Sequence, residues 1–212
     1  MGRDKTGIPL PFGNGASLVQ WAADRIARVC VDWIVADNGR ALVQGAVSVT
    51  DGPGAGPVAG ILGAAAHVPT RPLLVLACDL PLIPACYLAE LAAATGDWVV
   101  PITAQGPEPL CALYGLRALD ALRDRVHLGQ LSLRDLGDRD PKLALRRIHS
   151  KDLMSQSFGT LEQIPAGQPH GFSSDIFFSN ANRPQDLELM EELGKNAALQ
   201  QDDFLRLDST KG

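Results

Sequence analysis

The clearest indication of the fold is the stretch LLVLACDLP at residues 73–81. An unbroken apolar run followed by Asp and Pro is typical of a strand that a parallel sheet buries on both faces. Ligands of such sheets bind beyond the carboxyl ends of the strands, so Asp79 is the first candidate functional residue. We expect it to hold Mg²⁺, which needs only one or two carboxylates beside water and phosphate oxygens. A turn or helix-capping role for this Asp is the alternative.

Short apolar runs and helical patterns alternate on both sides of this stretch. Strands are expected at residues 31–36, 46–49, 73–77, 98–102 and 110–114, and helices at 17–29, 58–67, 84–95 and 117–128. Ser17 is available as the amino cap of the first helix. This alternation predicts an α/β fold in which helices cover both faces of a largely parallel sheet.

The pattern weakens after residue 148. Residues 149–174 are polar, contain several glycines and prolines and have no clear period, so we interpret them as a loop or inserted flap. A short apolar piece at 176–178 precedes a helix expected at 184–193. The 212 residues therefore predict one domain over residues 1–193 and a flexible tail over 194–212.

Composition excludes several classes of protein. Nineteen Lys and Arg against 24 Asp and Glu give a net charge of −5, which argues against binding of nucleic acid through a broadly positive surface. No apolar stretch reaches the ~18 residues of a membrane span. No signal-peptide pattern follows the charged amino end, so we expect a cytoplasmic protein. The four cysteines have no CxxC spacing and are interpreted as buried thiols.

The densest local signal is DGPGAGPVAG at residues 51–60. Four glycines between a short strand and an apolar helix predict a backbone that approaches a planar base or a phosphate closely. Asp51 could accept hydrogen bonds from a base or a ribose. A tight loop without a ligand is the alternative. The stretch matches neither the P-loop nor the dinucleotide-binding fingerprint.

Three further polar residues are candidates for a site. Lys5 is a flexible cation suited to neutralising phosphate charge, although a lysine near a chain end is more often a solvated charge. Asn180 and Asn182 offer amide groups to a ligand or a metal, and a turn before the following helix is the alternative. Three arginines that could pair with a phosphate stay unassigned: Arg117, Arg134 and Arg183.

These landmarks, in this order, resemble the molybdenum cofactor guanylyltransferase family, within the nucleotide-diphospho-sugar-transferase-like fold. The matching segments are MGRDK at 1–5, Asp51 with GPVAG at 56–60, CDLP at 78–81, EPLCALY at 108–114, LGQLSLRDL at 128–136 and NANRPQD at 180–186. The resemblance implies a three-layer, Rossmann-like nucleotidyltransferase fold with a mostly parallel central sheet.

The resemblance also implies an activity, namely transfer of GMP from Mg-GTP to the terminal phosphate of molybdenum-bound molybdopterin, with release of pyrophosphate. By position, Lys5 and Asp79 would be the catalytic residues that bind the GTP phosphates, with Mg²⁺ on Asp79. Asp51 and Asp37 would contact the nucleoside, and Asn38 is an alternative match for Asp37.

The acceptor side is implied in the same way. Asn180 and Asn182 would line the pterin or the metal surroundings. The implied partners are GTP, molybdopterin or the molybdenum cofactor, molybdenum-cofactor synthesis proteins and recipient molybdoenzymes. Neither nucleic acid nor a membrane is expected as a partner.

Two departures from the family pattern stand out. The pattern has a buried strand ending in Leu-Ala-Gly-Gly before the motif that here starts at Met1, so the hypothesis is that the first strand is missing from this chain and that the protein begins upstream. Residues 149–174 are also longer than the expected link.

Two alternatives to the implied activity stay open. One is cytidylyl transfer to the same acceptor, and the other is a non-catalytic protein that binds the molybdenum cofactor. A sugar-phosphate nucleotidyltransferase agrees less well with the landmarks.

Overall fold

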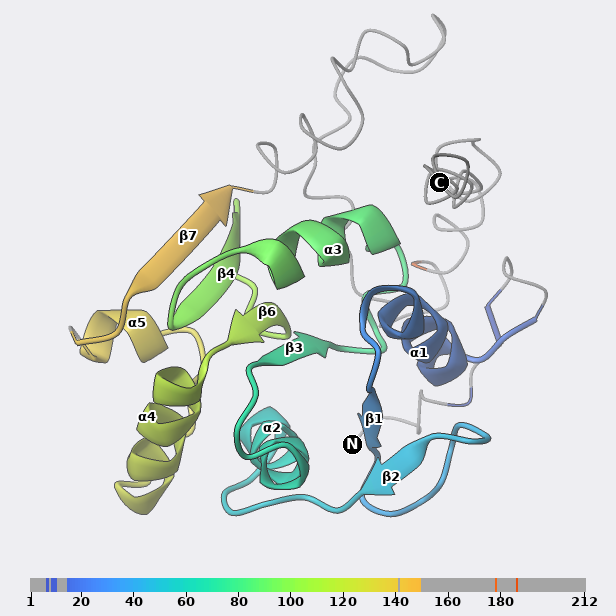
Figure 1. Cartoon of the computed structure of the whole chain (residues 1–212), viewed down its shortest axis with the longest axis horizontal. Helices are drawn as coiled ribbons and strands as arrows, with labels where there is room; N and C mark the ends of the chain where they lie inside the picture. The colour runs from blue at the N-terminus through green and yellow to red at the C-terminus, as the bar shows by residue number, and fades with distance from the viewer. Residues whose placement is uncertain are drawn as a thin grey trace, which may run out of the picture.

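The computed structural model describes residues 7, 9–10, 15–140, 142–149, 178 and 186 (Figure 1). Helices and strands alternate along the chain as the sequence predicts. The helices are α1 (Leu18–Val29), α2 (Pro57–His67), α3 (Ala85–Ala93), α4 (Leu116–His127) and α5 (Leu136–Arg139). The strands are β1 (Ile34–Ala36), β2 (Val47–Val49), β3 (Leu73–Leu76), β4 (Trp98–Thr103), β5 (Gly106–Pro107), β6 (Cys111–Tyr114) and β7 (Leu145–His149). Every element expected between residues 17 and 128 is present.

Helix α1 begins where its capping residue predicts. The Ser17 hydroxyl accepts a hydrogen bond from the backbone N–H of Gln20 at 3.3 Å, which satisfies one of the unpaired donors of the first turn. Leu18 and Ala22 of the predicted apolar stripe are buried. The predicted cap and the predicted buried face are therefore both confirmed.

The strands form two separate ladders in the described part of the chain. β1 and β2 pair in parallel, with Ile34 opposite Val47. The larger sheet has the order β3-β6-β4-β5, and β7 pairs with β4 in parallel. Strand β6 is antiparallel to both of its neighbours, β3 and β4. The sequence did not predict this reversal, because the apolar run at 110–114 carries no information about its direction.

An ion pair brings the starts of β1 and β3 near each other. Asp32, just before β1, and Arg71, just before β3, form an ion pair at 2.5 Å, so both strands start on the same side of the molecule. β4 and β7 run the same way as β3, because β6 is antiparallel to both β3 and β4 and β7 is parallel to β4. The arrangement is the mostly parallel α/β fold that the sequence predicts.

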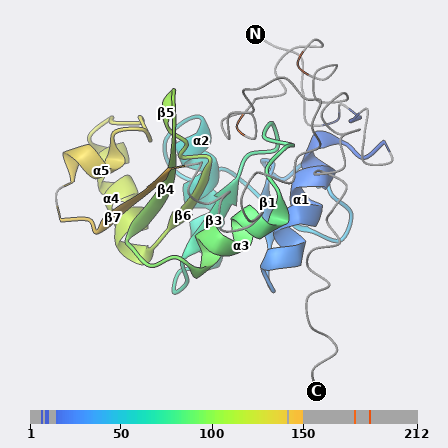
Figure 2. The ribbon, with the colours of Figure 1, turned by 90° about the horizontal axis from the view of Figure 1, so that it is seen from above.

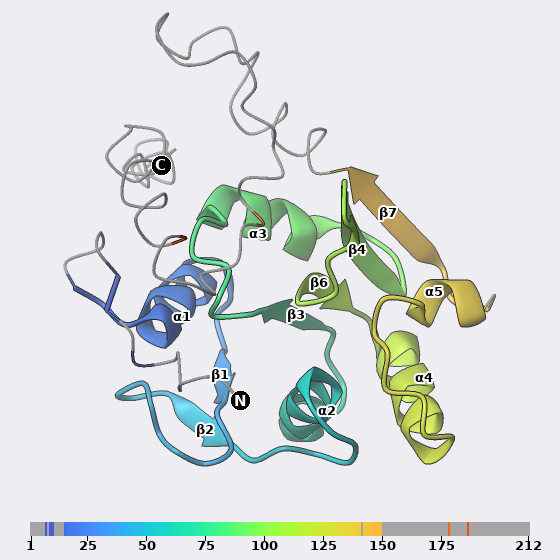
Figure 3. The ribbon, with the colours of Figure 1, turned by 180° about the vertical axis from the view of Figure 1, so that it is seen from behind.

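Figure 3 shows the β1–β2 pair beside β3 but outside the ladder of the larger sheet. Among the described residues, β3 pairs with β6 alone, and its four residues are only half-buried although all are apolar. The four residues of β6, in contrast, are fully buried. The hypothesis of a further strand before Met1 stays a prediction.

Helices cover the larger sheet on both faces. On one face, Trp98, Val100 and Tyr114 pack against α2 and α4, which lie below the sheet in Figure 1. On the other face, Val99 and Leu113 pack against α3 and the end of α1, and Figure 2 shows these two helices side by side. Successive strand residues point to opposite faces, so one apolar strand fills two cores. The predicted three layers are confirmed.

Three elements were not predicted: β5, α5 and β7. His149, which the sequence interpretation assigned to the start of a loop, is instead the last residue of β7 and lies opposite Ile102 of β4. The apolar piece at 176–178, the expected helix at 184–193, the rest of the loop and the tail lie outside the described residues, apart from Phe178 and Asp186.

The four cysteines are thiols, and Cys111 is the one that is wholly buried. Burial raises the pKa of Cys111, and the nearby Glu108 carboxylate raises it further. This confirms the interpretation of a buried structural thiol at this position, whereas Cys30, Cys78 and Cys86, also expected to be buried, are only half-buried. Within the described residues, no helix combines the length and the apolar character that crossing a bilayer requires.

Candidate functional site

Three of the predicted site residues lie where strands end. Asp37 directly follows β1, Asp51 lies shortly after β2, and Asp79 lies shortly after β3. β1 and β2 are parallel, and Leu42 after β1 packs against the same apolar cluster as Cys78 after β3, so the three strand ends lie near one another. The carboxyl ends of strands are where open α/β sheets bind their ligands.

Contacts between the strand ends bring these segments together. A Cβ atom built on Gly60 of α2 would lie 3.6 Å from Ala36 Cβ and 3.8 Å from Asp51 Oδ1, so the Asp51 carboxylate lies beside the end of β1. Cys78, the residue before Asp79, packs against the same apolar cluster, around Val43, as Leu42 from the turn that follows β1. The three segments therefore adjoin one another in space.

Asp37 is 4% exposed, and both carboxylate oxygens accept hydrogen bonds from the chain. Oδ2 accepts from the N–H of Leu42 at 2.8 Å, and Oδ1 accepts from the Ser48 hydroxyl. Burial alone would raise the pKa of Asp37, but these bonds, with others from the backbone of Arg40 and Gly39, hold the pKa below its usual value. Asp37 is therefore a carboxylate at neutral pH that fixes the turn after β1. A direct contact with a nucleotide stays a prediction.

The turn after β1 has an unusual backbone. Asn38 and Ala41 both lie in the left-handed region, with φ of 59° and 54°. Alanine rarely adopts this conformation, so the surrounding hydrogen bonds have to maintain it. Arg40 Nε donates to the Asp37 carbonyl at 2.9 Å, and the Ala41 N–H donates to Ser48 Oγ at 3.2 Å. Asn38 is exposed, so it remains the alternative nucleoside contact.

Packing within the chain explains part of the glycine-rich segment 51–60. A Cβ on Gly52 would lie 2.6 Å from the backbone nitrogen of Gly63 in α2, and the Gly52 N–H donates to the Ala59 carbonyl at 2.8 Å. Gly52 therefore allows the close approach of loop and helix that a tight loop requires. Gly56, the amino cap of α2, has a φ of 63° and no atom within 4 Å of its Cβ position, which leaves space for a ligand at this point.

Asp79 begins the turn at residues 79–84 that connects β3 with α3. The Ala77 N–H donates to the Leu110 carbonyl at 2.7 Å, which fixes the chain just before Asp79. Leu80 and Ile83 are at most 2% exposed, whereas Asp79 is half-buried. A half-buried carboxylate on a well-packed turn meets the requirements of a ligand for phosphate-bound Mg²⁺.

Four residues named in the sequence interpretation lie outside the described residues: Lys5, Asn180, Asn182 and Arg183. Their predicted roles stay predictions. Phe178 is described and packs edge-on against Tyr87 of α3, with 5.6 Å between the ring centroids.

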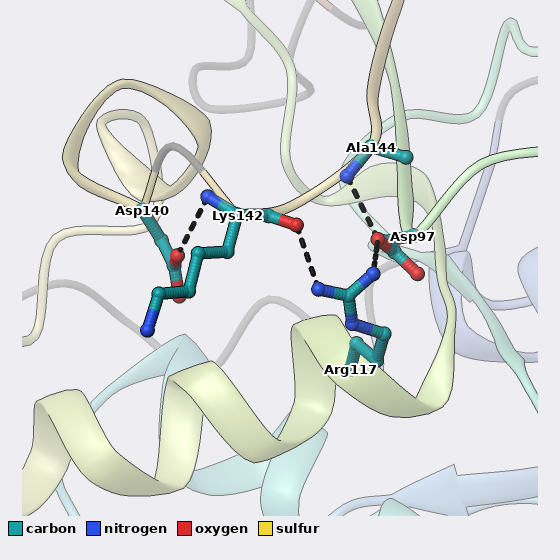
Figure 4. A network of polar contacts seen from close by, with 5 residues as sticks. All are labelled: Asp97, Arg117, Asp140, Lys142 and Ala144. Atoms are coloured by element: carbon teal, nitrogen blue, oxygen red, sulfur yellow. Dashed lines mark hydrogen bonds and ion pairs between the residues drawn. The ribbon is translucent and has the colours of Figure 1, made fainter.

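Two arginines that the sequence left unassigned have partners within the protein. Arg117 of α4 donates to Asp97 at 3.1 Å and to the Lys142 carbonyl at 2.7 Å, which joins α4 to the segment before β7 (Figure 4). Arg134 donates to the Gln105 carbonyl at 3.0 Å. Both arginines therefore stabilise the fold on the side of β4 and β7.

Ser48 is a site residue that the sequence interpretation missed. It lies on β2 and binds Asp37 on the neighbouring strand end, so it supports the turn from a different segment. Its position as the one polar residue in the apolar run at 46–49 was the available signal, because a polar side chain there needs a partner.

The sequence matches the family described as the MobA-like NTP transferase domain over residues 1–151. The chain belongs to this family. Membership in the MobA-like NTP transferase family confirms the resemblance drawn from the sequence landmarks. It also confirms nucleotidyltransferase as the class of enzyme to which the family belongs.

Several relatives in the family are named for the molybdenum cofactor. A probable molybdenum cofactor guanylyltransferase of Opitutus terrae is 40% identical over 85 residues, which are 38% of this chain and 42% of that protein. The molybdenum cofactor guanylyltransferase of Desulfosudis oleivorans is 27% identical over 150 residues, 66% of this chain and 71% of that protein. A probable molybdenum cofactor guanylyltransferase of Nostoc sp. is 30% identical over 141 residues, 61% and 66% of the two chains. The matched parts therefore span 42–71% of the length of these relatives.

A solved structure shows the same fold. Molybdopterin-guanine dinucleotide biosynthesis protein A from Archaeoglobus fulgidus superposes with a TM-score of 0.68 at 24% identity, and the match covers 92% of each chain. This likeness confirms the MobA-like arrangement of strands and helices.

Proposed function

We propose that the protein is a molybdenum cofactor guanylyltransferase that transfers GMP from Mg-GTP to molybdenum-bound molybdopterin. The observation that carries the proposal is the placement of Asp37, Asp51 and Asp79 after three strands at one edge of a MobA-like fold. The names of the curated relatives favour GTP as the donor nucleotide and the molybdenum cofactor as the product.

The proposed reaction needs no covalent bond to the protein. A terminal phosphate oxygen of molybdopterin attacks the α-phosphorus of GTP in line, and the new P–O bond forms as the bond to the β-phosphate oxygen breaks. Pyrophosphate leaves with the electron pair of the broken bond, and the guanine dinucleotide cofactor remains. Positioning of the two phosphates and neutralisation of their charge would supply most of the acceleration.

Asp79 is the residue that would hold magnesium. Among residues 15–140 and the other described positions, no three His, Cys, Asp or Glu side chains form a metal-binding cluster. Mg²⁺ requires fewer protein ligands, because water and substrate phosphates complete its shell. A single half-buried carboxylate at the strand edge therefore fits the ion. When bound, Mg²⁺ would neutralise charge on the GTP phosphates.

The other carboxylates would act on the nucleoside. Asp51 is exposed beside the end of β1 and would accept hydrogen bonds from the ribose or the base. Asp37 already uses both oxygens within the chain, so its contribution would come through the turn that it holds. Asn38, the next residue on that turn, is exposed and would contact guanine directly.

The remaining roles follow from the resemblance. Lys5 would neutralise phosphate charge as pyrophosphate leaves, and Asn180 with Asn182 would contact the pterin side. Proteins that make the molybdenum cofactor would supply the acceptor, and molybdoenzymes would receive the product. We also propose a cytoplasmic location.

Titration calorimetry tests the proposal. GTP, CTP and ATP are titrated with and without Mg²⁺ into the wild type, into Asp79→Ala, and into Asp120→Ala as a control whose carboxylate is 69% exposed on α4. We expect Mg²⁺-dependent binding that prefers GTP, is lost in Asp79→Ala and is unchanged in the control. A preference for CTP would overturn guanylyl transfer in favour of cytidylyl transfer. Absence of nucleotide binding would favour the non-catalytic cofactor-binding protein.

A further inference from the structure

The turn that carries Asp79 has few hydrogen bonds of its own. It contains Pro81 and Pro84, which lack backbone N–H groups. Its internal backbone bonds are long, with Leu80 N–H to the Ala77 carbonyl at 3.3 Å and Ile83 N–H to the Leu80 carbonyl at 3.4 Å. The carbonyls of Pro81 and Ile83 are accessible to donors from elsewhere in the chain.

Two side chains of α1 supply these donors. Trp21 Nε1 donates to the Pro81 carbonyl at 2.7 Å, and Arg25 Nε donates to the Ile83 carbonyl at 2.9 Å. Both bonds are shorter than the backbone bonds inside the turn. They connect residues about sixty positions apart in sequence, so they fix the turn to a separate helix.

Trp21 and Arg25 also hold each other in place. They are separated by one helical turn on the same side of α1, and the Arg25 guanidinium carbon lies 3.9 Å from the centre of the Trp21 ring. Arg25 is 2% exposed, and a cation over an indole face is stabilised more strongly when water is excluded. The pair therefore forms a donor platform in which Arg25 is buried and Trp21 is half-buried.

We propose that Trp21 and Arg25 are positioning residues that fix Asp79 for binding of the magnesium–nucleotide complex. The chain on one side of Asp79 is fixed by the bond from Ala77 to Leu110, and on the other side by the bonds from α1. A carboxylate whose backbone is held on both sides loses less conformational entropy when it binds a ligand. This inference rests on the proposed function, because Asp79 is the ligand in both.

Trp21→Phe tests the inference with little change in packing. Phenylalanine keeps a ring beneath the Arg25 guanidinium but removes the indole N–H that binds the Pro81 carbonyl. Arg25→Lys is the second variant, because it keeps the charge and loses the Nε–H that binds Ile83. Gln20→Ala is the matched control on the same helix, since its side chain binds Asp24 on the exposed face.

Two measurements are made on each variant. The first is the Mg²⁺ concentration that gives half-maximal GTP binding, which we expect to rise about fivefold in Trp21→Phe and to stay unchanged in the control. The second is amide hydrogen exchange at residues 80, 82 and 83 without ligand, which we expect to become faster in Trp21→Phe. In an Asp79→Asn background the same substitution should no longer change the residual, Mg²⁺-independent GTP affinity, because the residue that it positions has lost its charge.

The outcomes distinguish this inference from the proposed function. A wild type that shows no Mg²⁺-dependent GTP binding would overturn the proposed function itself. A wild type that binds GTP, with Trp21→Phe and Arg25→Lys requiring the same Mg²⁺ concentration, would overturn only the positioning role. A loss of GTP affinity that is equal in the wild-type and Asp79→Asn backgrounds would also overturn it, because a purely structural effect does not depend on the charge of this side chain.

Discussion

Replacing Asp37 by alanine removes the acceptor on which the turn after β1 depends. The Leu42 N–H and the Ser48 hydroxyl both donate to this carboxylate, which is 4% exposed. The substitution leaves both donors without their charged acceptor, and it releases the Ser48 hydroxyl, whose oxygen also accepts from the N–H of Ala41.

The expected cost follows from these contacts. A hydrogen bond to a charged group contributes about 1.5–3 kcal/mol, and two such bonds are lost. Leu42 and Ser48 are only half-buried, so water can replace part of what is lost. We therefore expect Asp37→Ala to lower the free energy of unfolding by about 2–3 kcal/mol, and Asp37→Asn, which keeps one carbonyl acceptor, by about half of that.

The pH dependence gives this prediction a second, independent measurement. Because the folded protein lowers the pKa of Asp37, the stabilisation is fully present above the unfolded pKa of about 4 and is lost as the pH falls through the folded pKa. The difference in stability between wild type and Asp37→Ala should therefore be largest at neutral pH and should shrink progressively below about pH 4.

Urea denaturation followed by tryptophan fluorescence measures both effects. Asp120→Ala is the control, since its exposed carboxylate pairs with Arg123 across one helical turn and should contribute less than about 1 kcal/mol. A loss of stability in Asp37→Ala no larger than in this control would show that the carboxylate does not stabilise the turn. A loss of stability that is the same at pH 7 and at pH 3 would show the same.

Two further substitutions test the packing around the site. Arg125 of α4 is 6% exposed and binds carbonyl and carboxylate oxygens of the segment after the helix. Arg125→Met should therefore lower the free energy of unfolding by about 3 kcal/mol in a denaturant titration, and the more exposed Arg123→Met by less than about 1 kcal/mol. Equal losses in the two variants would contradict this. Gly63→Ala should lower the midpoint of thermal unfolding strongly, because its Cβ would lie 2.2 Å from the Thr50 carbonyl oxygen. Gly60→Ala on the same helix is the control: its Cβ would meet ordinary contacts, so the substitution should be neutral or slightly stabilising. A well-tolerated Gly63→Ala would mean that α2 does not pack so closely on the loop.

Much of the fold could be predicted because its signals are local. The apolar run at 73–77 by itself predicts a strand, and the apolar stripe after the capping residue Ser17 by itself predicts a helix. The structure has β3 and α1 at these places. Strand β7 was missed because Arg146 and Arg147 interrupt its apolar pattern, and it is held as a strand by pairing with β4. Pairing between distant segments leaves no local trace in the sequence.

The site could be predicted in part for the same reason. Asp37, Asp51 and Asp79 follow apolar runs, and the ends of parallel strands meet at one edge, so their common location follows from the strand pattern. No local pattern indicated that Asp37 would be engaged by Ser48, since this contact joins two strand ends. Arg25 is likewise a residue type that is usually solvated on a helix. It is buried here because its guanidinium donates to the Ile83 carbonyl and lies over the Trp21 ring.

Transfer of the nucleotide can be measured by following the α-phosphate of GTP. The protein is incubated with GTP labelled at the α-phosphate, Mg²⁺ and molybdenum-bound molybdopterin, and the label is traced in the products. We expect label in a guanine dinucleotide cofactor with an equal amount of pyrophosphate, and loss of both in Asp79→Asn. Cofactor formation that proceeds at the wild-type rate in Asp79→Asn, or label that stays in GTP with the wild type, would contradict the proposed transfer.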